Sequence, residues 1–272
     1  MSESMKRGRA RARRWGLAMA LLAAMLPLTD RVTAEPAPVV LGMHYVAPPH
    51  VPGAKVRTPE GLAPVLAERL AKALPLRTRV VSPDAVLTQK EKAEKAPADL
   101  YLLPLSAEDA RRVKGHVIPT GYRAGIMAIM RTDTDIHAWE DLRDRTVCLA
   151  EGSGLTGQLA ARHGAREIVT RAPADALLKL RIGECDASVH DSTLLEALLQ
   201  FPEWQKFSAR LPVLDERDLS FIVPDSSAAP TEVLQQHVQA WQEGGVLAQL
   251  TEQAARDIAF EVYMDQEVPD CH

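Results

Sequence analysis

The chain has 272 residues, of which 46% are hydrophobic and 25% are charged, and its formal net charge is −4 at pH 7. Residues 1–34 hold seven Lys or Arg and two Asp or Glu, so the rest of the chain carries a net charge of −9. This acidic balance excludes nucleic acid and anionic membrane surfaces as expected partners.

The first 34 residues have the organisation of a secretory signal peptide. A basic stretch from Lys6 to Arg14 precedes an apolar run over residues 15–28, and small residues end at Ala34. We expect cleavage after Ala34 and export to the periplasm, because the apolar run is short for a membrane span. An uncleaved anchor is the alternative. About 238 residues then remain, enough for one large domain or two lobes.

The first part of the chain alternates strand-like and helix-like segments. An apolar run over residues 39–45 predicts a strand, and leucines spaced by four over residues 62–74 predict a helix. Residues 77–81 and 99–105 predict two more strands, with a polar helix or loop at 88–95 between them. This order predicts a mostly parallel sheet covered by helices.

The same pattern returns further along. Strands are predicted at 146–150, 167–170, 186–191 and 220–224, with a helix ending near His163 and another over 172–181. Two final helices are separated by Gly244 and Gly245. The repeat predicts an α/β fold of two similar lobes. We assign residues 35–125 plus 222–272 to lobe 1 and residues 126–221 to lobe 2, with a hinge near 125–130 and 212–221.

Polar residues gather where the predicted strands end. Ser106 and Arg111 follow the strand at 99–105, a Gly-Ser-Gly turn at 152–154 leads into a helix, and Asp191 ends the strand at 186–191. Ligands of open α/β sheets bind beyond the carboxyl ends of the strands. Arg suits a carboxylate, Asp suits an ammonium group, and a helix start suits an anion. A cleft holding these groups would recognise a zwitterion.

These motifs resemble the type II periplasmic substrate-binding proteins that serve polar amino-acid ABC transporters (solute-binding protein family 3). The resemblance covers residues 39–257 and rests on three stretches of sequence. These are Asp99–Ser106–Arg111 with Tyr122 following, the segment from Trp139 to Ser153, and the segment from Leu177 to Asp191. It implies the two-lobed periplasmic-binding-protein-like II fold.

The resemblance also implies the ligand-binding residues. Ser106 and Arg111 would bind the α-carboxylate of the ligand, Ser153 and the following backbone N–H groups would close on it, and Asp191 would hold the α-amino group. The family stacks an aromatic residue after its first strand, and Tyr45 is the nearest one here. The predicted set is Tyr45, Ser106, Arg111, Ser153, Gly154, Thr156 and Asp191.

Each assignment has a structural alternative. Arg111 could pair with Glu108 on its own helix, and Asp191 could cap the helix that follows it. His44, His50 and His190 lie near strand ends, but their spacing is not that of metal ligands, so we expect no metal and no cofactor. Cys148 and Cys185 fall in or beside neighbouring strands, so a disulfide between them is conceivable. We favour free buried thiols, because parallel neighbours rarely fit disulfide geometry.

The expected function is a monomeric periplasmic solute-binding protein, not an enzyme. It would close two lobes over an amino acid or similar small polar molecule and deliver it to an ABC permease in the inner membrane. One alternative is a periplasmic lyase or dehydratase on the same fold, for which Glu151 is the best acid–base candidate. The other is an accessory or sensor protein whose pocket has been lost, which the apolar Leu103 and Pro104 favour.

Overall fold

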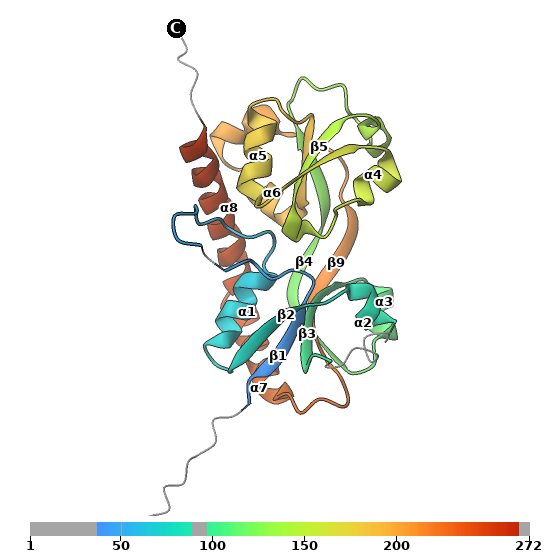
Figure 1. Cartoon of the computed structure of the whole chain (residues 1–272), viewed down its shortest axis with the longest axis vertical. Helices are drawn as coiled ribbons and strands as arrows, with labels where there is room; N and C mark the ends of the chain where they lie inside the picture. Colours follow the sequence, from blue (N-terminus) through green and yellow to red (C-terminus); the bar gives the residue numbers. More distant parts are fainter. Residues whose placement is uncertain (1–36, 50, 89–96, 267–272) are drawn as a thin grey trace, which may run out of the picture. The chain divides into compact units, whose positions relative to one another are not determined.

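The computed structural model describes residues 37–49, 51–88 and 97–266. The predicted signal peptide, most of the predicted segment at 88–95, His50 and Cys271 lie outside these residues. Figure 1 shows how the helices and strands are arranged. The strands are β1 (Val39–Met43), β2 (Leu76–Val80), β3 (Leu100–Leu105), β4 (His116–Met130), β5 (Thr146–Ala150), β6 (Arg166–Thr170), β7 (Ala187–Asp191), β8 (Ala209–Arg210) and β9 (Leu214–Val223).

The helices separate the strands much as the sequence predicts. They are α1 (Ala63–Ala71), α2 (Pro83–Leu87), α3 (Ala107–Arg112), α4 (Gln158–His163), α5 (Pro173–Arg181), α6 (Ser192–Leu198), α7 (Thr231–Glu243) and α8 (Val246–Asp265), with short 3₁₀ helices at Trp139–Leu142, Glu151–Ser153 and Pro202–Phe207. Within the described ranges, no helix has both the length and the apolar character that crossing a membrane requires.

One sheet of nine strands contains two parallel halves. The strand order is β2-β1-β3-β9-β4-β7-β5-β6, and β8 pairs with β4 off this path. β2, β1 and β3 are parallel, as are β6, β5 and β7, while β9 and β4 run antiparallel to their neighbours. The predicted repeat of parallel strands covered by helices is therefore confirmed.

The pair β4–β9 joins the two halves. β4 is 15 residues long and was not predicted, because Pro119, Gly121 and Gly125 interrupt its pattern. Its register with β9 shifts between Pro119 and Arg123 and again after Ala124. At Gly125 a Cβ would lie 2.4 Å from the Val213 side chain, so glycine permits the close crossing there. The hinge predicted at 125–130 and 212–221 falls within this pair and stays a prediction.

Hydrophobic clusters cover both faces of each half. In β3, Leu100 and Leu102 face one cluster while Tyr101 and Leu103 face another, as the two-residue period of a strand requires. We call these two clusters, on β2-β1-β3-β9, the first core region. The clusters on β4-β7-β5-β6 form the second core region, where Met127 and Met130 lie on opposite faces.

Helix α8 contacts both core regions. Its beginning, at Val246, Leu247 and Leu250, packs against the first core region together with α7. Ala255, Ile258, Ala259 and Val262 are buried in the second, and α8 contacts α5 and α6 there. The expectation that all of 222–272 packs with lobe 1 is therefore wrong for the second half of α8. At 20 residues the helix is long enough to reach beyond one core.

Cys148 and Cys185 form a disulfide, so the expectation of free thiols is wrong. Cys185 lies just before β7, which begins at Ala187, whereas Cys148 on β5 is in register with Ser188, further along β7. The two cysteines are thus offset along the ladder, and their Cα atoms are 5.9 Å apart, within the range that a disulfide spans. They lie in a small cluster with Ala176 and close a loop of sequence separation 37.

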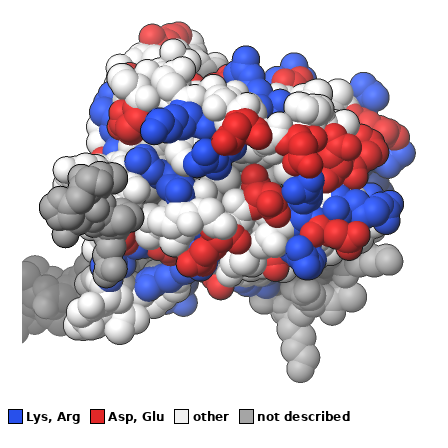
Figure 2. Space-filling model, turned by 90° about the horizontal axis from the view of Figure 1, so that it is seen from above, with Lys and Arg blue, Asp and Glu red and all other residues white. Residues whose placement is uncertain are grey.

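The face shown in Figure 2 carries acidic and basic side chains side by side. Several of the described surface charges form ion pairs, such as Arg145 with Asp135 at 2.5 Å and Arg131 with Asp133 at 2.9 Å. Exposed pairs of this kind contribute little to stability, because water and salt screen them. They affect solubility more than they position the pocket described next.

Candidate functional site

A cavity of about 1020 Å³ lies beyond the carboxyl ends of parallel strands from both halves of the sheet. It is bounded by the segments after β1, β2, β5 and β7 and by the crossing pair β4–β9. Its polar lining residues include His44, Glu60, Ser82, Asp84, Tyr122, Ser153, Thr156, Gln158, Arg162, His190, Asp191, Asp215 and Arg217. This is the position at which open α/β sheets bind ligands.

Asp191 lines the cavity and also caps α6. Its Oδ1 accepts hydrogen bonds from the Thr193 N–H (2.9 Å), the Thr193 hydroxyl (2.7 Å) and the Leu194 N–H (3.3 Å). Burial raises the pKa of the Asp191 carboxyl, and hydrogen bonds from Thr193 and Tyr122 oppose that rise. The two interpretations of Asp191 are compatible, because a capping carboxylate still presents charge to the cavity.

Tyr122, on β4, forms the wall next to Asp191. Its ring packs in the first core region, and its hydroxyl hydrogen-bonds the Thr193 hydroxyl. Burial, followed by the nearby charge of Asp191, raises the pKa of Tyr122 well above its ordinary value. The phenol therefore stays protonated at neutral pH.

A buried hydrogen-bonded chain that sequence reasoning missed runs from Glu60 to Ser188. The Glu60 Oε2 lies 2.7 Å from His190 Nδ1, and His190 Nε2 lies 2.8 Å from the Ser188 hydroxyl. The order resembles a serine–histidine–acid triad. Ser188, however, is fully buried and does not line the cavity, so its hydroxyl is not presented to a substrate. These hydrogen bonds therefore connect structural elements, and they do not prepare Ser188 as a nucleophile.

The turn after β5 carries three of the predicted residues into the lining: Ser153, Gly154 and Thr156. The Ser153 hydroxyl accepts the Leu155 N–H at 3.2 Å. His44 Nε2 lies 3.0 Å from the Gly152 carbonyl, and burial lowers the pKa of His44, so a neutral ring donates this hydrogen bond.

The anion site expected at the start of the following helix is already occupied by the chain itself. The N–H of Gly157 donates to Glu167 Oε2 at 2.6 Å, and the N–H of Ala160 donates to Oε1 at 2.8 Å. Glu167 thus supplies the negative charge that the first turn of α4 favours. The N–H groups of the Ser153–Thr156 turn, on which the predicted anion site rests, are not the ones that Glu167 occupies, so that part of the site stays a prediction.

Three predicted residues lie outside the lining. Ser106 caps α3, where its hydroxyl donates to Asp109 at 2.6 Å and accepts the Asp109 N–H at 3.0 Å. Arg111 is exposed on the same helix, and Tyr45 packs against Gly152. The structure thus does not bring Ser106, Arg111 and Tyr45 together with Asp191. The capping box explains Ser106, since its hydroxyl is committed to its own helix.

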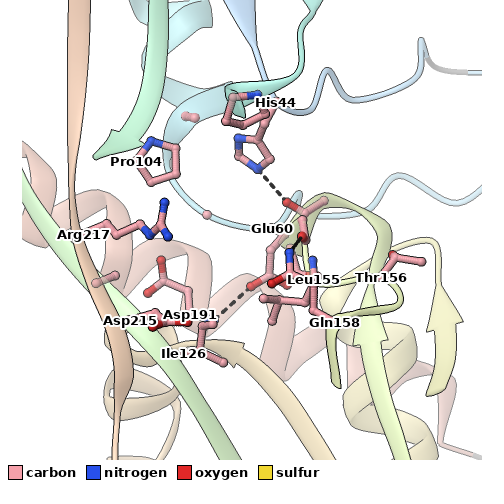
Figure 3. A pocket seen from close by; sticks show the side chains of 18 of the residues that line it. His44, Glu60, Pro104, Ile126, Leu155, Thr156, Gln158, Asp191, Asp215 and Arg217 are labelled. Atoms are coloured by element: carbon pink, nitrogen blue, oxygen red, sulfur yellow. Dashed lines mark hydrogen bonds between the residues drawn. The ribbon is translucent and has the colours of Figure 1, made fainter. Parts of the chain in front are cut away.

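Arg217 supplies a guanidinium to the lining instead. It lies on β9 opposite Ala124, and Asp191 lies opposite Ile126 on the other side of β4. Figure 3 shows Arg217, Asp215 and Asp191 on one side of the cavity, with Thr156 and Gln158 on the other. Asp215 pairs with Arg162 at 2.6 Å, whereas the Arg217 guanidinium is 3.8 Å from Asp109, beyond hydrogen-bond distance. Arg217 thus forms a long ion pair with Asp109, and its side chain is 39% exposed.

Metal binding has no support from the described residues. Among residues 37–49, 51–88 and 97–266, no three His, Cys, Asp or Glu side chains are grouped as a metal site requires.

No protein-family model and no curated protein matches the chain. Solved structures do match it. A mutant of ArgBP from T. maritima has 20% identity, covering 79% of this chain and 93% of that one, with a TM-score of 0.50. The GLUR0 ligand-binding core in complex with L-glutamate has 16% identity, 80% and 98% coverage, and a TM-score of 0.49.

A third similar structure is AbpA, an amino acid ABC transporter substrate-binding protein from Streptococcus pneumoniae bound to L-arginine. It has 15% identity, covers 81% of this chain and 95% of that one, and has a TM-score of 0.49. At these identities the likeness concerns the fold alone. The predicted α/β fold, in which each half is a mostly parallel sheet flanked by helices, is confirmed, and it is similar to the fold of the ArgBP structure.

Proposed function

We propose that this protein is an exported, monomeric solute-binding protein that captures an amino acid or a similar small zwitterion in the cavity and delivers it to an ABC permease. The observation that carries the proposal is that a half-buried carboxylate, Asp191, and a guanidinium, Arg217, both line one cavity. Lobe movement about the 125–130 and 212–221 segments would couple ligand capture to transport.

In this proposal the ligand ammonium group binds Asp191 and the ligand carboxylate binds Arg217. A desolvated carboxylate gains by acquiring a cation, and the Arg fork can hold a carboxylate through two parallel hydrogen bonds. Tyr122, with its proton retained, and the Ser153–Thr156 turn complete the polar surroundings. The proposal assigns no catalytic step to any residue. Arg111 remains the competing residue for the carboxylate.

Calorimetry and thermal shift with three probes test the proposal. The probes are an amino acid, its analogue without the amine and its analogue without the carboxylate. We expect the amino acid to raise Tm most. Asp191→Asn and Arg217→Gln should each lose about 2–5 kcal/mol of binding free energy, because each leaves one charged end of the ligand unpaired. Arg111→Gln distinguishes the two candidates for the carboxylate, and we expect it to bind as the wild type does.

Two outcomes would contradict the assignment. Loss of binding in Arg111→Gln with none in Arg217→Gln would move the carboxylate to α3, as the family resemblance implies. If no amino acid or small carboxylate raises Tm, the result favours a second function, that of an accessory or sensor protein with the same fold. The observation that favours it is that Glu60 and Glu167, carboxylates of the chain itself, already bind donors at this edge of the sheet.

A further inference from the structure

The segment over residues 55–60 belongs by chain order to the first core region, because it lies between β1 and α1. Its side chains nevertheless contact elements of the second. Figure 1 shows this part of the chain, in blue, beside α8. Arg57 pairs with Asp175 on α5 at 2.8 Å and with Asp265 at the end of α8, and Lys55 also bonds Asp265. Two core regions are thus joined by charged side chains.

Thr58 adds two hydrogen bonds to the same contact, one from its backbone N–H and one from its hydroxyl. Its N–H donates to Glu261 Oε1 at 2.9 Å, and its hydroxyl donates to the same oxygen at 2.7 Å. The side chains of Arg57 and Asp265 are only 13% and 12% exposed, so water and salt screen this cluster less than a surface pair. Hydrogen bonds from Lys55 and then Arg57 lower the pKa of Asp265, which keeps it ionised at neutral pH.

Glu60 ends the segment with a second, buried attachment. Its Oε2 lies 2.7 Å from His190 Nδ1, and its Oε1 accepts the Asp191 N–H at 3.2 Å. The side chains of Glu60 and His190 are 4% and 0% exposed. A carboxylate so buried is stable only with such partners, so separating the two core regions here would leave it unpaired.

Glycines allow this close approach from both sides. Gly61 has a φ of +68°, the left-handed conformation that lets the chain turn from Glu60 into α1. At Gly152, in the turn after β5, an added Cβ would lie 3.0 Å from the Cβ of Glu60. The turn of the second core region therefore packs directly on the segment.

We propose that residues 55–60 form a latch that holds the two core regions together without any ligand. The latch does not depend on the proposed transport function, because residues 55–60 make all of its contacts with other residues of the same chain. Its consequence is that Glu60, which lines the cavity, closes one wall of it in the ligand-free protein. A ligand then enters through the remaining opening or after the latch has released.

Hydrogen exchange and small-angle X-ray scattering of the ligand-free protein test the latch. In the wild type, we expect the amides of Thr58 and Asp191 to be protected, since both donate across the contact. In Arg57→Ala, exchange over residues 55–60 should be about a hundredfold faster, and the radius of gyration should rise. Arg131→Ala is the matched control, because its ion pair with Asp133 lies within one loop; it should change neither quantity.

The same measurements can overturn the proposal. Unprotected Thr58 and Asp191 amides in the wild type would show that the latch does not form in solution. Unchanged exchange and scattering in a folded Arg57→Ala would show that its ion pairs hold nothing together. If that variant does not fold, Glu60→Gln decides, because it keeps the side-chain volume and replaces with an amide nitrogen one of the two oxygens that contact His190 Nδ1 and the Asp191 N–H. Faster exchange in Glu60→Gln supports the latch, and wild-type exchange contradicts it.

Discussion

Removing the disulfide should destabilise the protein by an amount that its loop length sets. We consider Cys148→Ala combined with Cys185→Ala. The bond closes a loop of sequence separation 37, and the loss of that restraint on the unfolded chain corresponds to about 4 kcal/mol at room temperature. Both cysteines are buried, at 0% and 5% exposed, so the lost sulfur contacts should add to this loss.

Urea denaturation followed by tryptophan fluorescence measures the effect. Trp204 and Trp139 are buried in the second core region and Trp241 is buried in the first, so tryptophan emission reports on the unfolding of both. The reduced wild-type protein should have a free energy of unfolding similar to that of the double variant. Cys271→Ala is the control for removing a thiol, and it should leave the free energy of unfolding unchanged.

Two results would contradict this predicted loss of stability. One is a loss of less than about 1 kcal/mol, well below what the chain-entropy argument gives for this loop. The other is the titration of three free thiols in unfolded protein that was never reduced. That result would mean that Cys148 and Cys185 are unpaired in the folded protein, as the sequence alone led us to expect.

Two further predictions concern the cavity. Because burial raises the pKa of Asp191, this carboxyl takes up a proton at a higher pH than an ordinary aspartate; affinity for an ammonium-bearing probe should fall as the pH is lowered through that raised value. Calorimetry across a pH series should show this fall in the wild type, and its persistence in Asp191→Asn would exclude Asp191. Gly152→Ala should cost about 1–3 kcal/mol of stability, because the new Cβ would press on Glu60 and Tyr45. Denaturation identical to wild type would contradict that close packing.

Local sequence patterns were sufficient for most of the secondary structure. The strand at Thr146–Ala150 is observed with the predicted bounds, and the final helices are separated at Gly244 and Gly245 as expected. These elements follow from periodicity and from residues that end a helix, which act over a few positions. β4 was not predicted, because Pro119, Gly121 and Gly125 interrupt its alternation of apolar and polar residues. It nevertheless pairs with β9, with two shifts in register.

Some of the residues that line the cavity could be located from local sequence patterns. Asp191 and the Ser153–Thr156 turn were predicted because each follows a recognisable strand, and strand ends of a parallel half-sheet meet at one edge. That Arg162 and Arg217 line the cavity while Arg111 does not depends on the packing of α4 and on the register of β9 with β4, which shifts. Glu60 meets His190 across 130 positions of chain, and no local pattern encodes such a contact. The same holds for α8 and for the disulfide, since both depend on how separate elements pack.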